Sequence, residues 1–156
     1  MILRRPTPDD ATAMADLLNA IIALGGTTAH QVAKTPDQMR HAYIDGPDVR
    51  TAILALDQDR LLGFQSIELY QGEFHIGTFV QPGLQARGIG AAMFTETCAQ
   101  ARAAGITRIA AAIRADNVPG LAYYARMGFA DVGHDPGFAL NDGRVVGRIF
   151  RAYDLV

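Results

Sequence analysis

The segment from Gln85 to Gly90 constrains the fold of this chain most strongly, because it joins two runs of different character. An apolar, strand-like run ends before it at Val80, and a helical pattern begins after it at Ala91. Glycines let the backbone approach a ligand closely, and a helix N-terminus presents unpartnered N–H groups with a partial positive charge. This order predicts a phosphate-binding cradle, although two glycines also suit an ordinary turn.

Length and composition predict one globular domain spanning residues 1–156. Hydrophobic residues make up 49% and charged residues 19%, and no apolar stretch is long enough to span a bilayer. A net charge of -2 gives no basic field for nucleic acid or an anionic membrane surface, so neither is an expected partner. The first six residues lack the features of a secretory signal, so we expect a cytoplasmic protein. The single cysteine, Cys98, lies within a helical pattern and is assigned to packing.

The order of the apolar patterns predicts a mixed α/β chain. Helices are expected at 8–23, 36–43, 91–104 and 117–127, and strands at 2–5, 51–56, 61–70, 74–80, 108–113, 129–132 and 145–155. Thr35, Pro36 and Gln38 have the spacing of a capping box at the start of the second helix. The two strands around residues 57–60 should form an antiparallel hairpin, whereas a strand, helix and strand across 74–113 implies a parallel pair. The longer connection at 24–35 is a natural place for substrate contacts.

The glycine loop resembles a motif of one enzyme family. It lacks the Gly-Lys-Ser/Thr ending of a P-loop and the final glycine of a dinucleotide fingerprint. Residues 80–90 instead resemble the acetyl-CoA-binding motif of the GCN5-related N-acetyltransferase (GNAT) superfamily: Gln or Arg, two residues, Gly, one residue, then Gly or Ala. Gln85, Gly88 and Gly90 fill those positions.

A second GNAT motif resembles residues 117–129. Asn117 stands at a helix start, Tyr124 follows seven residues later, and Gly128-Phe129 forms the exit. The two motifs are also separated as they are in the family. The first predicted helix and the loop after it loosely resemble the phosphinothricin acetyltransferase branch.

The resemblance implies a fold, an activity and partners. The fold is a GNAT-type α/β fold whose mixed, mostly antiparallel sheet splays between its fourth and fifth strands, with helices on its faces. The activity is acetyl-CoA-dependent N-acetyl transfer to a primary amine by direct attack in a ternary complex, without a metal. The acceptor is expected to be a small molecule, such as phosphinothricin, methionine sulfoximine, a polyamine or an amine-bearing antibiotic. A protein N-terminus or lysine, a non-catalytic acyl-CoA sensor and a homodimer remain open.

The resemblance also implies which residues hold acetyl-CoA. Backbone groups near Phe79 and Val80 would pair with the pantetheine amides. The pyrophosphate would rest on the loop and the first turn of the helix, namely Gln85, Ala86, Arg87, Gly88, Ile89, Gly90 and Ala91. The Arg87 charge would assist. Asn117 would bond the pantetheine, cap its helix, or do both.

Catalysis requires a proton for the departing thiolate and a base for the amine. Tyr124 matches the family tyrosine that donates to the CoA sulfur, and Tyr123 should point away from it along the helix. Glu68 and His75 are the candidate bases, with Glu73 beside them. Strand alternation places Glu73 and His75 on one face and Val80 on the other, unless the family's bulge changes that register.

Overall fold

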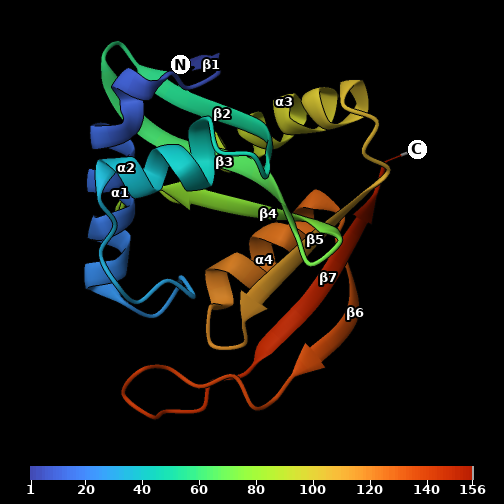
Figure 1. Cartoon of the computed structure of the whole chain (residues 1–156). Coiled ribbons are helices and arrows are strands. Elements are labelled where there is room, and N and C mark those ends of the chain that lie inside the picture. Colours follow the sequence, from blue (N-terminus) through green and yellow to red (C-terminus); the bar gives the residue numbers. More distant parts are fainter. Residues whose placement is uncertain (156) are drawn as a thin grey trace.

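The computed structural model describes residues 1–155 and contains a seven-stranded mixed sheet (Figure 1). The strand order is β1-β2-β3-β4-β5-β7-β6. The strands are β1 (Ile2–Arg4), β2 (Val49–Asp57), β3 (Arg60–Tyr70), β4 (Glu73–Val80), β5 (Arg108–Arg114), β6 (Ala130–Asp135) and β7 (Arg148–Asp154). Each neighbouring pair is antiparallel except β4 and β5, which are parallel. The predicted hairpin and the predicted parallel pair are therefore confirmed.

Helices cover both faces of this sheet. They are α1 (Ala11–Leu24), α2 (Pro36–Met39), α3 (Ile89–Ala103) and α4 (Val118–Met127), with short helical turns η1 (Pro8–Asp10) and η2 (Arg40–Ile44). Figure 1 shows α1 at the left of strands β2 to β4 and α2 in front of them, with α3 behind. The expected GNAT-type α/β fold is confirmed.

Local sequence chemistry sets several element boundaries. Thr35 and Gln38 form the predicted capping box, since the Thr35 hydroxyl accepts from the Gln38 N–H at 3.2 Å and the Gln38 side chain accepts from the Thr35 N–H at 2.9 Å. Helix α3 begins at Ile89 and not at Ala91, because Gly88 adopts a φ of +80° and turns the chain into the helix. The last strand begins at residue 148 and not at 145, after a loop that carries only an isolated bridge.

The core lies on both faces of the sheet. Met14 and Leu18 of α1 pack with Phe64 and Phe79 on one face, and Phe94 of α3 packs on the other with residues from β4, β5 and α4. Complete burial of each such side chain stabilises the fold by about 2 kcal/mol. Both faces are therefore closed except where the strands separate.

Strands β4 and β5 pair over a very short stretch. Their parallel register rests on one pair, His75 with Ala110. Toward Val80 and Arg114, the ends of the two strands, no further pair joins them. The expected splay is confirmed, and it leaves backbone groups of both strands facing an open gap.

Candidate active site

A cavity of about 870 Å³ reaches both faces of the sheet through this gap. The ends of β4 and β5 line it at residues 78–80 and 112–114. On one face it extends to the start of α3 and to α4, and on the other to η2, the end of β3 and residues 27–30. We call the first part the donor half and the second part the acceptor half. The connection expected to contact substrate thus lines the acceptor half.

The donor half ends at the N-terminus of α3. The first helical hydrogen bond joins the Ala92 N–H to the Gly88 carbonyl at 3.0 Å, so the N–H groups of Ile89, Gly90 and Ala91 have no helical acceptor. A Cβ atom built on Gly88 would meet nothing within 4 Å, which means that this helix end faces open space. The helix dipole and these N–H groups favour an anionic ligand there.

The structure places the other predicted loop residues unequally. Gln85 and Ala86 line the cavity, although the Gln85 side chain accepts from the Gly83 N–H at 2.9 Å within its own loop. Ala86 has a φ of +63°, a left-handed conformation that a non-glycine residue rarely adopts. Arg87 is exposed and is not among the described residues that line the cavity.

Gly90 has a packing role in addition to its place in the loop. A Cβ atom at this position would lie 2.6 Å from Cε1 of Tyr123. The Tyr123 hydroxyl donates to the Gly90 carbonyl at 2.8 Å, so the glycine lets α4 approach the start of α3 closely. Tyr123 is therefore held by α3, while its ring still lines the cavity beside Tyr124.

Tyr124 lies at the floor of the cavity, 8% exposed, with its hydroxyl 2.9 Å from the Thr78 hydroxyl. Burial raises the pKa of this phenol well above its usual range. Burial also raises the pKa of Tyr123, to about 12. The Gln65 side-chain amide donates to both the Thr78 hydroxyl at 2.9 Å and the Tyr123 hydroxyl at 3.1 Å. The two tyrosines thus belong to one buried polar network.

Asn117 caps α4 and also holds the connection at Thr27, which lines the cavity. Its side-chain oxygen accepts from the Gly120 N–H at 3.0 Å, and its amide donates to the Thr27 carbonyl at 3.0 Å. Arg114 holds the same connection by donating to the Thr28 carbonyl at 3.1 Å. These bonds from β5 and α4 fix residues 27 and 28 at the edge of the acceptor half.

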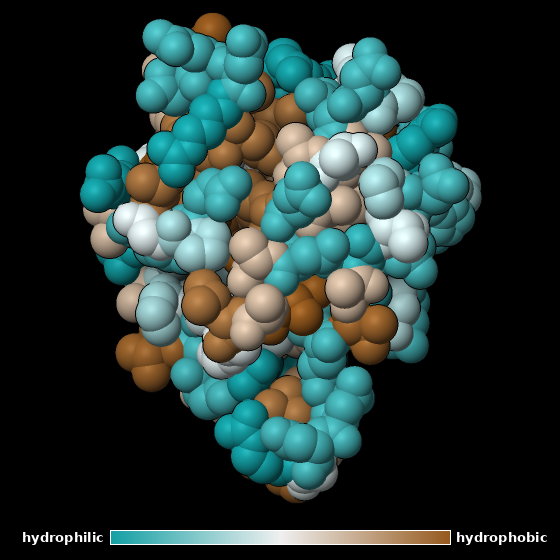
Figure 2. Space-filling view, turned by 90° about the vertical axis from the view of Figure 1, so that its left-hand side faces the viewer, coloured by the Kyte–Doolittle hydropathy of each residue, from teal (hydrophilic) through white to brown (hydrophobic). Residues whose placement is uncertain are grey.

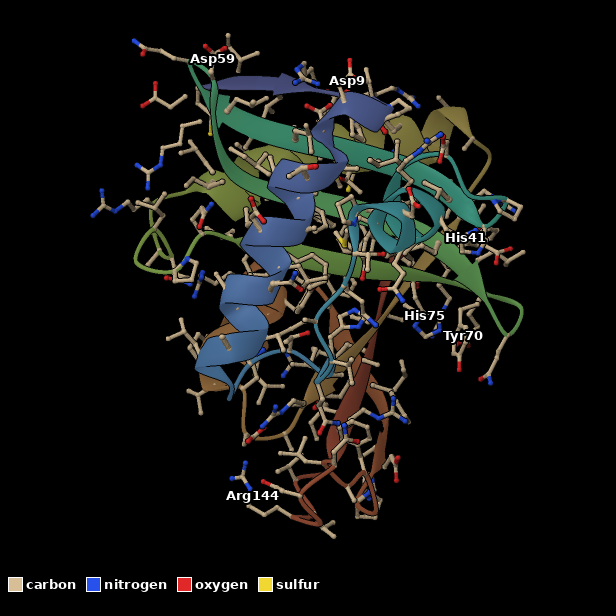
Figure 3. All side chains as sticks on the ribbon, turned by 60° about the vertical axis from the view of Figure 1, so that its left-hand side comes forward. Asp9, His41, Asp59, Tyr70, His75 and Arg144 are labelled. Carbon is tan, nitrogen blue, oxygen red and sulfur yellow. The ribbon has the colours of Figure 1, made fainter. Side chains whose placement is uncertain are left out.

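The candidate bases lie in the acceptor half. Glu68 and His75 face each other across the β3–β4 ladder, which runs without a bulge, so the predicted alternation holds. Burial raises the pKa of Glu68 to about 8, while a hydrogen bond from Ser66 at 3.0 Å opposes this shift. His75 lies 3.4 Å from Glu73 and packs edge-on against Tyr70 (Figure 3).

Aromatic side chains close the acceptor half on the α1 side. Phe79 is buried and packs against Tyr43, with ring centroids 5.7 Å apart. His30 lies 2.8 Å from the Tyr43 hydroxyl and 6.1 Å from the Phe79 ring. Burial, aided by Lys34, lowers the pKa of His30, so this imidazole is neutral near pH 7. On the side of the molecule where α1 lies, Figure 2 shows apolar residues among polar ones over the middle of the surface.

Comparison with known proteins decides the family. A model of the acetyltransferase (GNAT) family matches residues 20–129. The chain belongs to this family. It is 25% identical over 151 residues to YwnH of Bacillus subtilis (strain 168), a protein provisionally named a phosphinothricin acetyltransferase, and the match covers 92% of this chain and 93% of YwnH. The expected acetyltransferase family is confirmed.

Solved structures of GNAT proteins share the fold. A phosphinothricin acetyltransferase from Sinorhizobium meliloti in complex with acetyl-CoA superposes with a TM-score of 0.87 at 19% identity, covering 99% of this chain and 88% of that one. The yncA structure from Salmonella typhimurium, with acetyl-CoA as cofactor, gives a TM-score of 0.84 at 17% identity over 100% and 94% of the two chains. These neighbours agree with the expected donor, acetyl-CoA.

Two structural features are absent from residues 1–155. No helix in this range is long and apolar enough to cross a membrane. In the same range, His, Cys, Asp and Glu do not gather in groups of three that would hold a metal ion.

Sequence reasoning did not single out several residues of this GNAT site. Gln65 and Thr78 lie in strands among apolar neighbours. The signal that could have singled them out is a polar side chain on the buried face of a strand. Arg114 lies at the end of a strand, and its burial depends on partners far away in the sequence. His30 lies in the connection already expected to contact substrate.

Proposed function

We propose that this GNAT protein transfers the acetyl group of acetyl-CoA to the primary amine of a small molecule, by direct attack in a ternary complex. The observation that carries the proposal is the single cavity that joins the start of α3 to the acceptor half through the gap between β4 and β5. Two substrates that enter from opposite faces of the sheet meet in that gap. A direct transfer requires this arrangement, because the two reacting groups must be held in contact.

The donor half has the chemistry to hold acetyl-CoA. Open space beside Gly88 and the free N–H groups of Ile89, Gly90 and Ala91 suit a pyrophosphate. Backbone groups of Phe79 and Val80 face the gap, where the pantetheine amides would pair with them as a strand does. When bound, acetyl-CoA supplies an acetyl group on a thiol leaving group.

The side chains around the gap supply the proton transfers. Tyr124, buried and neutral, is the group that protonates the departing sulfur. Glu68 accepts the proton of the amine directly or through water, since a base with a pKa of about 8 is poised near the working pH. His75, across the ladder, is the other candidate for this role.

The direct test is thiol release from acetyl-CoA in the presence of a panel of small amines. We expect release with at least one amine and a loss of kcat of about 10²-fold or more in Tyr124→Phe, with the affinity for acetyl-CoA kept. Tyr123→Phe is the matched control, because its hydroxyl is bonded to Gly90, and it should retain more of kcat.

Three other outcomes would change the proposal. Tight acetyl-CoA binding without thiol release for any amine or lysine-bearing peptide would make the protein an acyl-CoA sensor. Release only with peptides would move the acceptor from small molecules to proteins. Equal kcat for Tyr124→Phe and the intact protein would remove Tyr124 from the mechanism.

A further inference from the structure

The acceptor half has an unequal balance of charged side chains. Two carboxylic acids line it: Asp48, which directly precedes β2, and Glu68, which lies near the end of the adjoining strand β3. Among the described residues that line the whole cavity, the permanent cations are Arg114 and Arg126, and Arg126 lies on α4 in the donor half. Lys34 acts on His30 by its charge but is not part of the lining. Among the described residues that line the acceptor half, Arg114 is therefore the permanent cation that could receive an anionic group of the acceptor.

Arg114 is already neutralised by its own partners. Its guanidinium makes a bidentate pair with Asp116, at 2.9 and 2.7 Å, and donates to the Thr28 carbonyl at 3.1 Å. The Arg114 side chain is 4% exposed, and its hydrogen bonds and its charge hold the pKa of Asp116 below the usual range. An incoming carboxylate would have to compete with a carboxylate that is already bound.

The other basic side chains among the described residues that line the acceptor half are histidines. His30 is held neutral by burial. His41 and His75 also line this half, and His75 faces the carboxylates of Glu73 and Glu68. Burying an anion in this half without a free cation to pair it is costly, whereas an ammonium group there is stabilised by the Asp48 carboxylate.

We infer that the acceptor is a primary amine with a hydrocarbon or aromatic body and no acidic group. This inference rests on the proposed function and narrows it. Phe79, Tyr43 and Tyr70 supply apolar surface for the body, and the Asp48 carboxylate attracts the amine end. The site therefore selects against amino acids of the phosphinothricin type, although relatives of the chain carry that name.

Matched pairs of acceptors that differ only in the carboxylate test this inference. Thiol release is measured for phenethylamine against phenylalanine and for cadaverine against lysine, and phosphinothricin is included as an acidic acceptor that the site should reject. We expect kcat/KM to favour the amine of each reactive pair by about 100-fold, the effect of one unpaired buried charge. Amino acids that react as well as their decarboxylated partners would overturn the inference and leave the proposed function standing. If neither member of any pair supports thiol release, the proposed function itself is wrong.

A charge-reversal variant provides an independent arm. Asp48→Arg places a free cation at the acceptor half, and we expect it to lower the preference for amines over amino acids at least tenfold. Asp59→Arg makes the same charge change in the turn at the opposite end of β3 and should leave the preference unchanged (Figure 3). If the Asp48 variant keeps the original preference, the charge balance of the cavity does not select the acceptor.

A different observation, the buried network around Tyr124, carries a second inference. The Gly90 carbonyl can only accept, so the Tyr123 hydroxyl donates its hydrogen there and must accept from Gln65. The group of Gln65 that faces Tyr123 is therefore its NH₂, and the same NH₂ donates to Thr78 at 2.9 Å. The hydrogen of Thr78 is then free to point to the Tyr124 oxygen at 2.9 Å.

We propose that Thr78 is a positioning residue for Tyr124. By donating to the phenol oxygen, Thr78 leaves the Tyr124 hydrogen free to point into the cavity. When Tyr124 gives this proton to the departing sulfur, the O–H bond of the phenol breaks and an S–H bond forms. Thr78 then donates to the phenolate that remains, and this hydrogen bond to a charged oxygen is the stronger one.

Thr78→Val keeps the shape of the side chain and removes the hydroxyl. We expect kcat to fall about tenfold with both KM values unchanged, and Thr78→Ser to restore most of it. A readout without turnover is the preference for CoA over desulfo-CoA, which should be smaller in Thr78→Val because the Tyr124 hydrogen is no longer directed toward the sulfur. A Thr78→Val kcat within twofold of the intact protein, or an unchanged preference for CoA, would overturn this role.

Discussion

The two halves of the cavity are built from different parts of the chain. The donor half depends mainly on backbone groups within one short segment, where a strand, a glycine loop and a helix follow one another from β4 to α3. The acceptor half depends on side chains from β3, β4, η2 and residues 27–30, and this last segment is held by Arg114 and Asn117. A local segment can be replaced as a unit, whereas the acceptor half changes when any distant support changes. We therefore expect substitutions to impair acetyl-CoA binding and acceptor binding separately.

The substitution Arg114→Met should give the largest difference in effect between the two halves of the cavity. The change removes a buried cation, leaves Asp116 without its partner and frees the Thr28 carbonyl, so the free energy of unfolding should fall by about 2 to 3 kcal/mol. The KM of the amine should rise more than the affinity for acetyl-CoA falls. Urea denaturation and steady-state kinetics check both.

Arg144→Met is the matched control for this change. Its side chain is 67% exposed and pairs with Asp142 on the surface, so its loss should change the free energy of unfolding by less than about 0.5 kcal/mol. A similar loss in both variants would mean that Arg114 gives no special support to the acceptor half.

Glu68→Gln tests the buried charge of the acceptor half through pH. The folded-state pKa of Glu68 is raised from 4.5 to about 8, so the folded protein holds this proton more tightly than the unfolded chain. Its contribution to stability is fully present below pH 4.5 and is lost as the pH rises through about 8. The intact protein should therefore lose roughly 5 kcal/mol between these limits that Glu68→Gln does not lose.

Urea denaturation between pH 5 and pH 9 measures this difference, and Glu73→Gln is the control because that carboxylate is 69% exposed. Parallel pH profiles for the intact protein and Glu68→Gln would show that the carboxylate is not desolvated.

Gly90→Ala tests the donor half. The new Cβ atom would lie 2.6 Å from Cε1 of Tyr123, so either α4 or the start of α3 must move. We expect the affinity for acetyl-CoA to fall about tenfold, or 1.4 kcal/mol, with little change in the KM of the amine. Truncating the ring in Gly90→Ala/Tyr123→Leu should recover part of this loss in a titration with acetyl-CoA. No recovery would place the cause in the loop itself and not in the packing of α4.

The same division explains how far sequence reasoning reaches. The glycine loop, the capping box at Thr35 and the parallel unit follow from residues close in sequence, so they were predictable from local rules. Arg114 and Gln65 acquire their roles from partners 86 and 58 residues away, and those pairings exist only after the sheet has formed. Strand alternation did place His75 and Glu73 on one face, because the β3–β4 ladder has no bulge. Which of the two candidate bases acts is set by burial, which a pattern does not measure.

Arg87 provides the smallest and most discriminating comparison within the donor half. The resemblance to GNAT enzymes predicts that it assists the pyrophosphate, whereas the structure leaves its side chain exposed and outside the described lining of the cavity. If backbone N–H groups provide the grip, Arg87→Gln should weaken acetyl-CoA binding by less than about 0.5 kcal/mol at physiological salt, because an exposed charge is screened. Calorimetric titration at low and high salt measures this change. A loss greater than tenfold that disappears at high salt would mean that the loop turns Arg87 toward the phosphates on binding, and the donor half would then depend on a side chain as the acceptor half does.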